Sequence, residues 1–231
     1  GSSSTAADTY SIAIQFGAIL AVLLLYRIRV WSAMKGLVGA DADGRAFLIR
    51  LIVAFLPAAF LGLLAGDAMK SALFGPVPVT IAWVVGGVFL LRWKPTVGSV
   101  SLHEMPIRAA LIIGCAQSIA LWPGVSRSLV TLVAALAVGL SMSSAIEFSF
   151  LLGLITLSSA TALDLTKHGS ELVDQFGILA PAIGLVCAFI TAVMAVKWMV
   201  GYLESHSLRF FGWYRLAIGA VSVVLLATNV L

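Results

Sequence analysis

The chain is divided into apolar runs of roughly the length of a membrane span, separated by short polar connections. Six such runs occupy most of the sequence, at residues 10–26, 46–65, 77–91, 145–163, 177–199 and 210–231. A transmembrane helix needs about 20 predominantly apolar residues, because the hydrocarbon core of a bilayer is about 30 Å thick. A helix also satisfies its backbone hydrogen bonds internally, as lipid requires. The pattern therefore predicts an all-α polytopic membrane protein with six full transmembrane helices.

The charge content excludes an ordinary soluble domain. Only 10% of the 231 residues are charged, whereas a soluble domain carries about 25%. The net charge is +4, but the basic residues sit mostly at the ends of apolar runs and form no dense patch with aromatic residues between them. We therefore expect the lipid bilayer as a partner and no nucleic acid.

The domain organisation follows from the same pattern. Residues 10–231 are expected to form a single transmembrane domain. Residues 1–9 lack an initiator Met and the pattern of a signal peptide, and are interpreted as either a cloning scar or the cut end of a longer chain. Residues 27–50, 92–108 and 197–215 are basic, so the positive-inside rule places them on the cytoplasmic side and both termini outside.

Two further apolar runs are too short to span. Residues 109–121 and 129–140 contain 13 and 12 residues and are separated by Pro123 and Gly124. Proline disfavours helix at the preceding residue, Trp122, so the first run should end there. We expect two half-helices that meet within the membrane as a re-entrant or discontinuous pair, with a single proline-kinked helix as the alternative. Irregular backbone at this depth is tolerated where it is buried or lines a wet cavity, and in transporters it marks the binding site.

Arg127 indicates what this break binds. It is a permanent cation in apolar sequence, which is costly in a bilayer unless the charge is paired, and its planar fork suits phosphate oxygens. Ser128 is interpreted as the N-cap of a helix that begins at Leu129, with Thr131 near the third helical position. The free N–H groups and the dipole of that first turn would form an anion site.

Other polar residues surround the same point. Gly124 lets a ligand approach the backbone closely. Gln117 either reaches the cavity or forms a hydrogen bond between helices. Glu147 is either a counter-ion for Arg127, in which case the serines only satisfy a kink, or a carboxylate favoured by the helix dipole. Hydroxyl groups come from Ser126, Ser128 and Thr131.

Several stretches also resemble the bacterial undecaprenyl-pyrophosphate phosphatase (UppP/BacA) family, and together they cover nearly the whole chain in the family's order. Pro-Gly-x-Ser-Arg-Ser is a specific signature of that family. The matching stretches are Gly-Cys-Ala-Gln-Ser-Ile-Ala-Leu-Trp-Pro-Gly-Val-Ser-Arg-Ser at residues 114–128, Thr131, Glu-Phe-Ser-Phe-Leu-Leu at 147–152, Ala-Thr-Ala-Leu-Asp at 160–164, and Ile-Gln-Phe-Gly-Ala-Ile-Leu-Ala-Val at 14–22.

The resemblance implies a membrane hydrolase that converts undecaprenyl pyrophosphate to the monophosphate carrier of cell-wall (peptidoglycan) synthesis. The resemblance also implies that recycling of this lipid carrier gives resistance to the antibiotic bacitracin. The implied fold is an inverted repeat with two re-entrant elements that meet at one site, in a multi-pass protein of the bacterial inner membrane. A divalent metal, Mg or Ca, is the implied cofactor. The implied partners are a polyprenyl pyrophosphate lipid and the membrane, with a homodimer as a candidate assembly.

Combined with the residues above, the resemblance gives a set of candidate roles. Glu147 is expected to support the site without direct contact with the substrate, and the metal ligands remain unknown. The catalytic candidates are Arg127, Ser126 and Ser128, and the substrate-binding candidates are Gly124, Thr131 and Gln117.

The chain also departs from the family pattern. Family members open with an earlier segment that carries a glutamate-rich motif and then a Ser-Ser-Ser-Gly-His-like loop. Here Ser2, Ser3 and Ser4 are followed by no His, so no role is carried to them. The implied metal ligands then lie mostly outside this chain, which is expected to be incomplete for catalysis and to bind the lipid headgroup better than it hydrolyses it. The alternative function is a non-enzymatic protein that binds or transports a polyprenyl-phosphate lipid.

Overall fold

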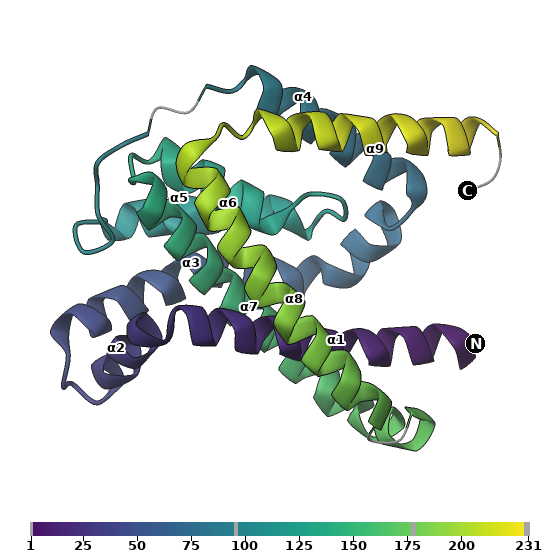
Figure 1. Ribbon diagram of the computed structural model, residues 1–231, viewed down its shortest axis with the longest axis horizontal. Helices are drawn as coiled ribbons and strands as arrows, with labels where there is room; N and C mark the ends of the chain where they lie inside the picture. Colours follow the sequence, from purple (N-terminus) through teal and green to yellow (C-terminus); the bar gives the residue numbers. More distant parts are fainter. Residues whose placement is uncertain (1, 95–96, 177–178, 229–231) are drawn as a thin grey trace. The chain divides into compact units, whose positions relative to one another are not determined.

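The computed structural model describes residues 2–94, 97–176 and 179–228 (Figure 1). Within these ranges the chain is helical apart from short connections, and the only β-type pairing is an isolated bridge between Val100 and Leu140. The all-α prediction is therefore confirmed. The helices are α1 (Ser2–Leu25), α2 (Arg27–Leu37), α3 (Ala42–Leu73), α4 (Pro76–Arg92), α5 (Ile107–Gln117), the 3₁₀ helix η1 (Ser118–Leu121), α6 (Arg127–Ala137), α7 (Met142–Phe176), α8 (Leu179–Ser205) and α9 (Arg209–Ala227).

Several of these helices can cross a bilayer. Within the described residues, four segments are long and apolar enough, namely Ala42–Gly66, Met142–Leu163, Pro181–Ser205 and Arg209–Ala227. A bent pair, Ile14–Leu25 with Arg27–Leu37, turns by 85° at its break and brings the total to five if it is one span. In each of the four segments, at most 39% of its apolar 18-residue stretch is buried inside the protein. Such extensive exposed apolar surface suits lipid, and the chain is a multi-pass membrane protein.

The spans differ in part from the six that the sequence predicts. Residues 77–91 fall in α4, whose 17 residues make it one of the shorter apolar helices. Residues 109–121 and 129–140 correspond to the short helices Ile107–Leu121 and Arg127–Ala137, as expected. The runs at 177–199 and 210–231 extend at one end beyond the described residues, and the six-span count stays a prediction.

The chain divides into two compact units, Gly1–Leu48 with Phe150–Gly201, and Ile49–Ser149 with Tyr202–Leu231. In the first unit, α1 packs so closely on α8 that a Cβ added to Gly17 would lie 2.6 Å from the Leu185 carbonyl oxygen. The Thr161 hydroxyl of α7 donates a hydrogen bond of 2.8 Å to Gln15 Oε1. Two of the stretches that carry the family resemblance, 14–22 and 160–164, are therefore in contact.

The second unit contains the broken helix. α4 and α9 pack along each other, and α5 packs against α6. α5 also lies close to α3, because a Cβ added to Gly114 would be 2.4 Å from the Ala54 carbonyl oxygen. Leu136 of α6 is nearly inaccessible to solvent, as are Leu140 and Phe148 further along the chain. These contacts fix both half-helices, and thereby the loop between them.

Asp41 begins α3 in the first unit. Its Oδ1 accepts a hydrogen bond of 2.8 Å from the Gly44 N–H, and its Oδ2 accepts one of 2.6 Å from the Ser32 hydroxyl of α2. This is the geometry of a helix N-cap, which satisfies a first-turn amide. The Ser32 hydroxyl and the Gly44 amide hold the pKa of the Asp41 carboxyl below its usual range, because both donate to the charged form.

Asp41→Asn should therefore lower the melting temperature of the protein more at about pH 7 than at about pH 3. The folded-state pKa lies below the unfolded value of about 3.9. The stabilisation is present above that value and is lost as the pH falls through the folded-state pKa. Thermal unfolding in detergent at both pH values measures this, with Glu204→Gln, at an exposed carboxylate of α8, as a control for the loss of charge. An equal difference at the two pH values would contradict this role of Asp41.

Candidate functional site

The loop between α5–η1 and α6 is a tight turn followed by a new helix. η1 ends at Leu121, and Trp122 is extended with φ −74° and ψ 120°. The Val125 N–H donates to the Trp122 carbonyl at 3.1 Å, so residues 122–125 form a β-turn. Gly124 has φ +89°, and this turn, with proline second and a positive-φ glycine third, is of type II. The predicted break at Trp122 is confirmed.

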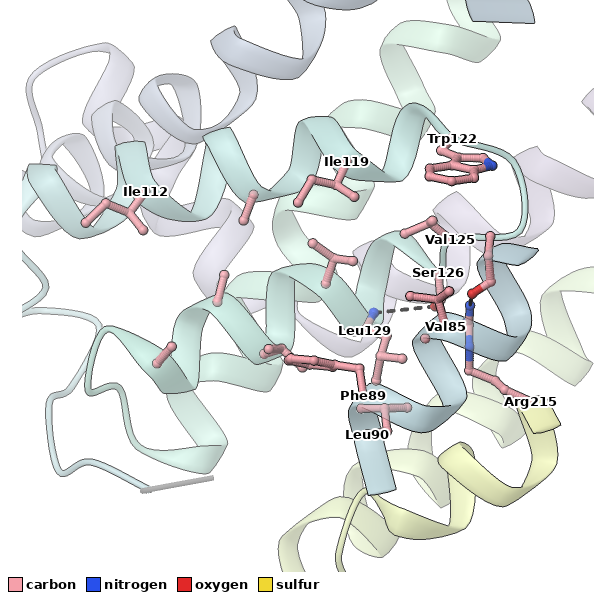
Figure 2. A pocket seen from close by; sticks show the side chains of 17 residues that line it. Val85, Phe89, Leu90, Ile112, Ile119, Trp122, Val125, Ser126, Leu129 and Arg215 are labelled. Carbon is pink, nitrogen blue, oxygen red and sulfur yellow. Dashed lines mark hydrogen bonds between the residues drawn. The ribbon is translucent and has the colours of Figure 1, made fainter. Parts of the chain in front are cut away.

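The two half-helices fold back on each other. α5 packs against α6, and Figure 2 shows the two helices side by side with the loop joining their ends. A single proline-kinked helix would continue in one general direction, so that alternative is wrong. The polar loop residues are thereby placed at the tip of a helical hairpin.

The start of α6 differs from the prediction in one respect. α6 begins at Arg127, and its N-cap is Ser126, whose hydroxyl accepts the Leu129 N–H at 3.4 Å (Figure 2). The predicted N-cap, Ser128, is instead the second residue of the helix, and Thr131 lies two positions further into it than expected. The β-turn at residues 122–125 causes this difference. Ser126, which follows the turn, is extended with φ −73° and ψ 115°, the backbone conformation of an N-cap, and the helix begins at the next residue.

The first turn of α6 has backbone donors that are unpaired within the helix, and two hydroxyl groups. The first helical hydrogen bond runs from the Val130 N–H to the Ser126 carbonyl, so the N–H groups of Arg127 and Ser128 have no acceptor within the helix. The hydroxyls of Ser126 and Ser128 lie 3.4 Å apart at the same point. Free amides, hydroxyls and the positive end of the helix dipole together favour a phosphate.

The Arg127 side chain is half-buried, and its guanidinium makes no hydrogen bond or ion pair with any described residue. Glu147 is also half-buried, within the second turn of α7. The two side chains form no ion pair with each other, so the sequence-based alternative of a structural Arg127–Glu147 pair is not what the structure contains. A partly desolvated cation beside the N-terminus of a helix is suited to an anionic ligand.

Thr131 and Ser149 lock the first turn of α6 onto α7. Thr131 is only 1% exposed; its hydroxyl lies beside the Ser149 hydroxyl and 3.0 Å from the Arg127 carbonyl oxygen. Ser149 donates a further hydrogen bond of 3.0 Å to the Ser128 carbonyl. The structure thus places Thr131 beneath the loop, where it holds the backbone of Arg127 and Ser128.

Gln117 ends α5 and is 2% exposed. Neither its Oε1 nor its Nε2 has a hydrogen-bond partner, so the hydrogen bond between helices that was one of its two expected roles is not formed among the described residues. Buried amide atoms of this kind are normally satisfied by protein, water or ligand. A direct contact between Gln117 and substrate stays a prediction.

Arg215 of α9 is a residue that the sequence analysis missed. It is 9% exposed, and its Nη2 donates to the Gly124 carbonyl at 2.8 Å and to the Ala82 carbonyl at 2.9 Å. Figure 2 shows the side chain reaching toward the loop. The sequence pattern places Arg215 only among the basic residues of 197–215 and indicates no role for it. The available signal was its position, six residues inside an apolar run and not at the end of the run.

An apolar groove of about 570 Å³ adjoins the loop. Its walls come from α4, α5, η1, the loop and α6, with Phe89 and Ile112 among them (Figure 2). Val133 of α6 also lines the groove. Ser126 and Arg215 are among its few polar residues. The groove therefore joins a polar end at the loop before α6 to a hydrophobic body, an arrangement that suits an amphiphile.

The described residues do not form a metal site. In the part of the chain that the structure describes, no three His, Cys, Asp or Glu side chains gather closely enough to hold an ion. Magnesium and calcium prefer several oxygen ligands, of which carboxylates are the usual protein donors. Glu147 alone does not meet that requirement.

Comparisons with known proteins show the family to which the chain belongs. Residues 1–221 match the family model described as bacitracin resistance protein BacA. A protein of Sorangium cellulosum named undecaprenyl-diphosphatase is 42% identical over 228 residues, which cover 96% of this chain and 74% of that protein. Proteins of the same name from Bradyrhizobium diazoefficiens and Nitrosomonas europaea are 40% and 41% identical, over 95% and 93% of this chain and 83% and 79% of those proteins.

Proposed function

This chain belongs to the bacitracin resistance protein BacA family, and from this we infer that it is an undecaprenyl-diphosphatase. It hydrolyses the terminal phosphoanhydride of undecaprenyl pyrophosphate and releases inorganic phosphate and the monophosphate lipid. The observation that carries the assignment of the site is the start of α6, where Ser126 caps a helix that opens with Arg127. Relatives named for this hydrolysis favour it over non-enzymatic lipid binding or transport.

The geometry suggests how the chain acts on the pyrophosphate. We propose that the N–H groups of Arg127 and Ser128 bind the phosphoryl oxygens, and that the Arg127 guanidinium balances the charge that grows on them as the anhydride bond breaks. Fixed donors of this kind stabilise a phosphoryl-transfer transition state more than the ground state. Ser126 and Ser128, through their hydroxyl groups, are the other two proposed catalytic residues beside Arg127. Gly124, Thr131 and Gln117 shape or support the binding surface, and Glu147 supports it from α7.

Phosphate release from undecaprenyl pyrophosphate by the purified chain in detergent micelles tests the activity. We expect equal amounts of inorganic phosphate and undecaprenyl phosphate to appear. This differs from the sequence-based expectation that the chain binds the headgroup better than it hydrolyses it, because relatives that match 95–96% of this chain are named for the hydrolysis. Binding of the lipid pyrophosphate without release would instead support the alternative, a protein that binds or transports a polyprenyl phosphate. In cells, expression of the chain should raise the bacitracin concentration that the host tolerates.

The apolar groove supports a lipid substrate. Because Val125 and Ser126 belong both to the loop and to the groove lining, a pyrophosphate bound at the loop would place its isoprenoid chain at the groove entrance. Burial of each methylene is worth about 0.8 kcal/mol, so a groove of this kind would select long apolar chains over short ones. We propose that the isoprenoid units nearest the pyrophosphate lie in this groove.

Val133→Trp should therefore discriminate between substrates by chain length. The indole would fill part of the groove, and we expect a KM increase of about tenfold for undecaprenyl pyrophosphate with a smaller change for farnesyl pyrophosphate. Val221→Trp, at an exposed position of α9, is a matched control that adds the same side chain outside the groove. Equal KM changes for both substrates would refute this placement of the isoprenoid chain.

Other features of the family remain proposals for this chain. We propose that it resides in the bacterial inner membrane and forms an inverted repeat of six spans, and a homodimer is a further prediction. A bent or broken helix pair in each compact unit, α1–α2 in one and α5–α6 in the other, supports the repeat. A divalent cation stays a prediction as well. Since the described residues do not fit a metal site, we derive no step through one.

A further inference from the structure

The guanidinium of Arg215 is buried, and it donates hydrogen bonds to backbone carbonyl oxygens. Its Nη2 is shared between Gly124 of the loop and Ala82 of α4. Its Nε, also buried, has no hydrogen-bond partner in the described structure. Burial of a guanidinium costs free energy. Here the buried guanidinium contacts the turn that precedes α6, so a role at that turn is the natural explanation.

The packing of α4 against α9 is adapted to this guanidinium. A Cβ added to Gly86 would lie 2.8 Å from Nη2 and 2.9 Å from Nε of Arg215. Such distances are shorter than van der Waals contact, so any side chain at position 86 would displace the guanidinium. Gly86 therefore provides the space in which Arg215 reaches the loop.

The loop has three attachments, and they differ in kind. The Trp122 indole N–H donates to the Pro78 carbonyl at 3.2 Å, and the Ser126 hydroxyl caps α6. Both are neutral hydrogen bonds near the ends of the loop. The Arg215 contact is charge-assisted, which makes it stronger, and it holds the Gly124 carbonyl in the middle of the turn.

The orientation of the Gly124 carbonyl also matters electrostatically. A carbonyl oxygen that faced the phosphate would repel it, whereas the N–H groups of α6 attract it. The Gly124 carbonyl oxygen accepts a hydrogen bond from Arg215, so the negative end of the carbonyl dipole faces the guanidinium. The loop can then present donors to an anion.

We propose that Arg215 is a positioning residue for the phosphate-binding turn. It acts through Gly124 to fix the backbone that carries Ser126 and Arg127, and it does not itself contact the pyrophosphate. This inference rests on the proposed function, because it assigns Arg215 to the same reaction. Displacement of a reacting group by about 1 Å can reduce a rate by about a hundredfold, so a positioning contact has measurable consequences.

The first experiment is a double-mutant cycle that combines Arg215→Gln with Arg127→Lys. Phosphate release and binding of undecaprenyl pyrophosphate are both measured on the purified chain. Alone, Arg215→Gln should lower kcat/KM by about tenfold to a hundredfold, and Arg215→Lys should recover part of the loss. If Arg215 acts through the loop that carries Arg127, Arg215→Gln should cause a much smaller loss in the Arg127→Lys background.

The matched control for this cycle is Arg209→Gln, at an exposed residue of the same helix. It removes the same charge away from the loop and should leave kcat/KM unchanged. An equal loss from Arg215→Gln in both backgrounds, or no loss at all, would overturn the proposal. A wild-type chain that binds the lipid pyrophosphate but releases no phosphate would refute the proposed activity, and the same cycle would then be measured on binding.

A second pair of variants tests the contact without changing Arg215. Gly86→Ala displaces the guanidinium, whereas Gly87→Ala would place its Cβ 2.9 Å from Leu216 Cγ and disturb only the packing of α4 on α9. Both should lower the melting temperature, but only Gly86→Ala should reduce kcat/KM of the folded protein. Equal kcat/KM for the two variants would show that Arg215 serves helix packing and not the loop.

Discussion

Arg127→Ala should reduce phosphate release from undecaprenyl pyrophosphate by about a hundredfold to a thousandfold. This is the effect of removing one preorganised donor from the developing charge of a transition state. Arg127 is suited to that role because it opens α6 beside two free N–H groups and its guanidinium makes no hydrogen bond or ion pair with a described residue. The rate of inorganic phosphate release by the purified variant, relative to wild type, measures the loss.

Two further variants separate the role of the guanidinium from general effects of charge. Arg127→Lys keeps the charge but loses the planar fork, so its rate should lie between those of wild type and Arg127→Ala. Arg108→Ala removes an exposed cation at the start of α5 and should leave the rate unchanged. Full activity in Arg127→Ala would remove Arg127 from the catalytic site, whatever the result for Arg127→Lys.

Gly124→Ala should lower both the stability and the activity of the protein. The backbone at Gly124 has φ +89°, and an added Cβ would lie 2.9 Å from the Val79 carbonyl oxygen and 3.1 Å from Ala82 Cβ. The left-handed conformation alone costs about 1–2 kcal/mol for a residue with a side chain. The close contact with α4 adds to this and would push the turn away from Arg215.

Gly39→Ala is the matched control for the backbone effect. Gly39 also has a positive φ, +77°, but nothing lies within 4 Å of its added Cβ. It should therefore lower the melting temperature less than Gly124→Ala and leave phosphate release by the folded protein intact. If the two variants lose the same stability and both keep full activity, the tight fit of the loop against α4 has no functional role.

The broken helix was predictable because its causes are local. Pro123 acts on the residue before it, and Gly124 supplies the positive φ that a type II turn requires. Two apolar runs too short to span then leave a half-helix pair as the simplest arrangement. The presence of Arg127 in this loop could also be interpreted directly, since a cation in apolar sequence needs an anion.

The details that depend on tertiary structure were not predictable in the same way. Ser126 and Ser128 are both good N-cap residues, and the geometry of the turn decided between them. Arg215 lies 91 residues from Gly124 in the chain, so no local pattern connects them. Gln117 shows the same limit, because the absence of a partner for its buried amide follows only from the packing of α5.

The most direct test of the central claim is a structure of the chain with a methylene-bridged analogue of undecaprenyl pyrophosphate, which cannot be hydrolysed. We predict that the terminal phosphonate lies at the start of α6, within hydrogen-bond distance of the Arg127 guanidinium and the Ser128 N–H, with the isoprenoid chain entering the groove beside Val133. A headgroup bound elsewhere, with the start of α6 unoccupied, would contradict the assignment of this loop as the pyrophosphate site.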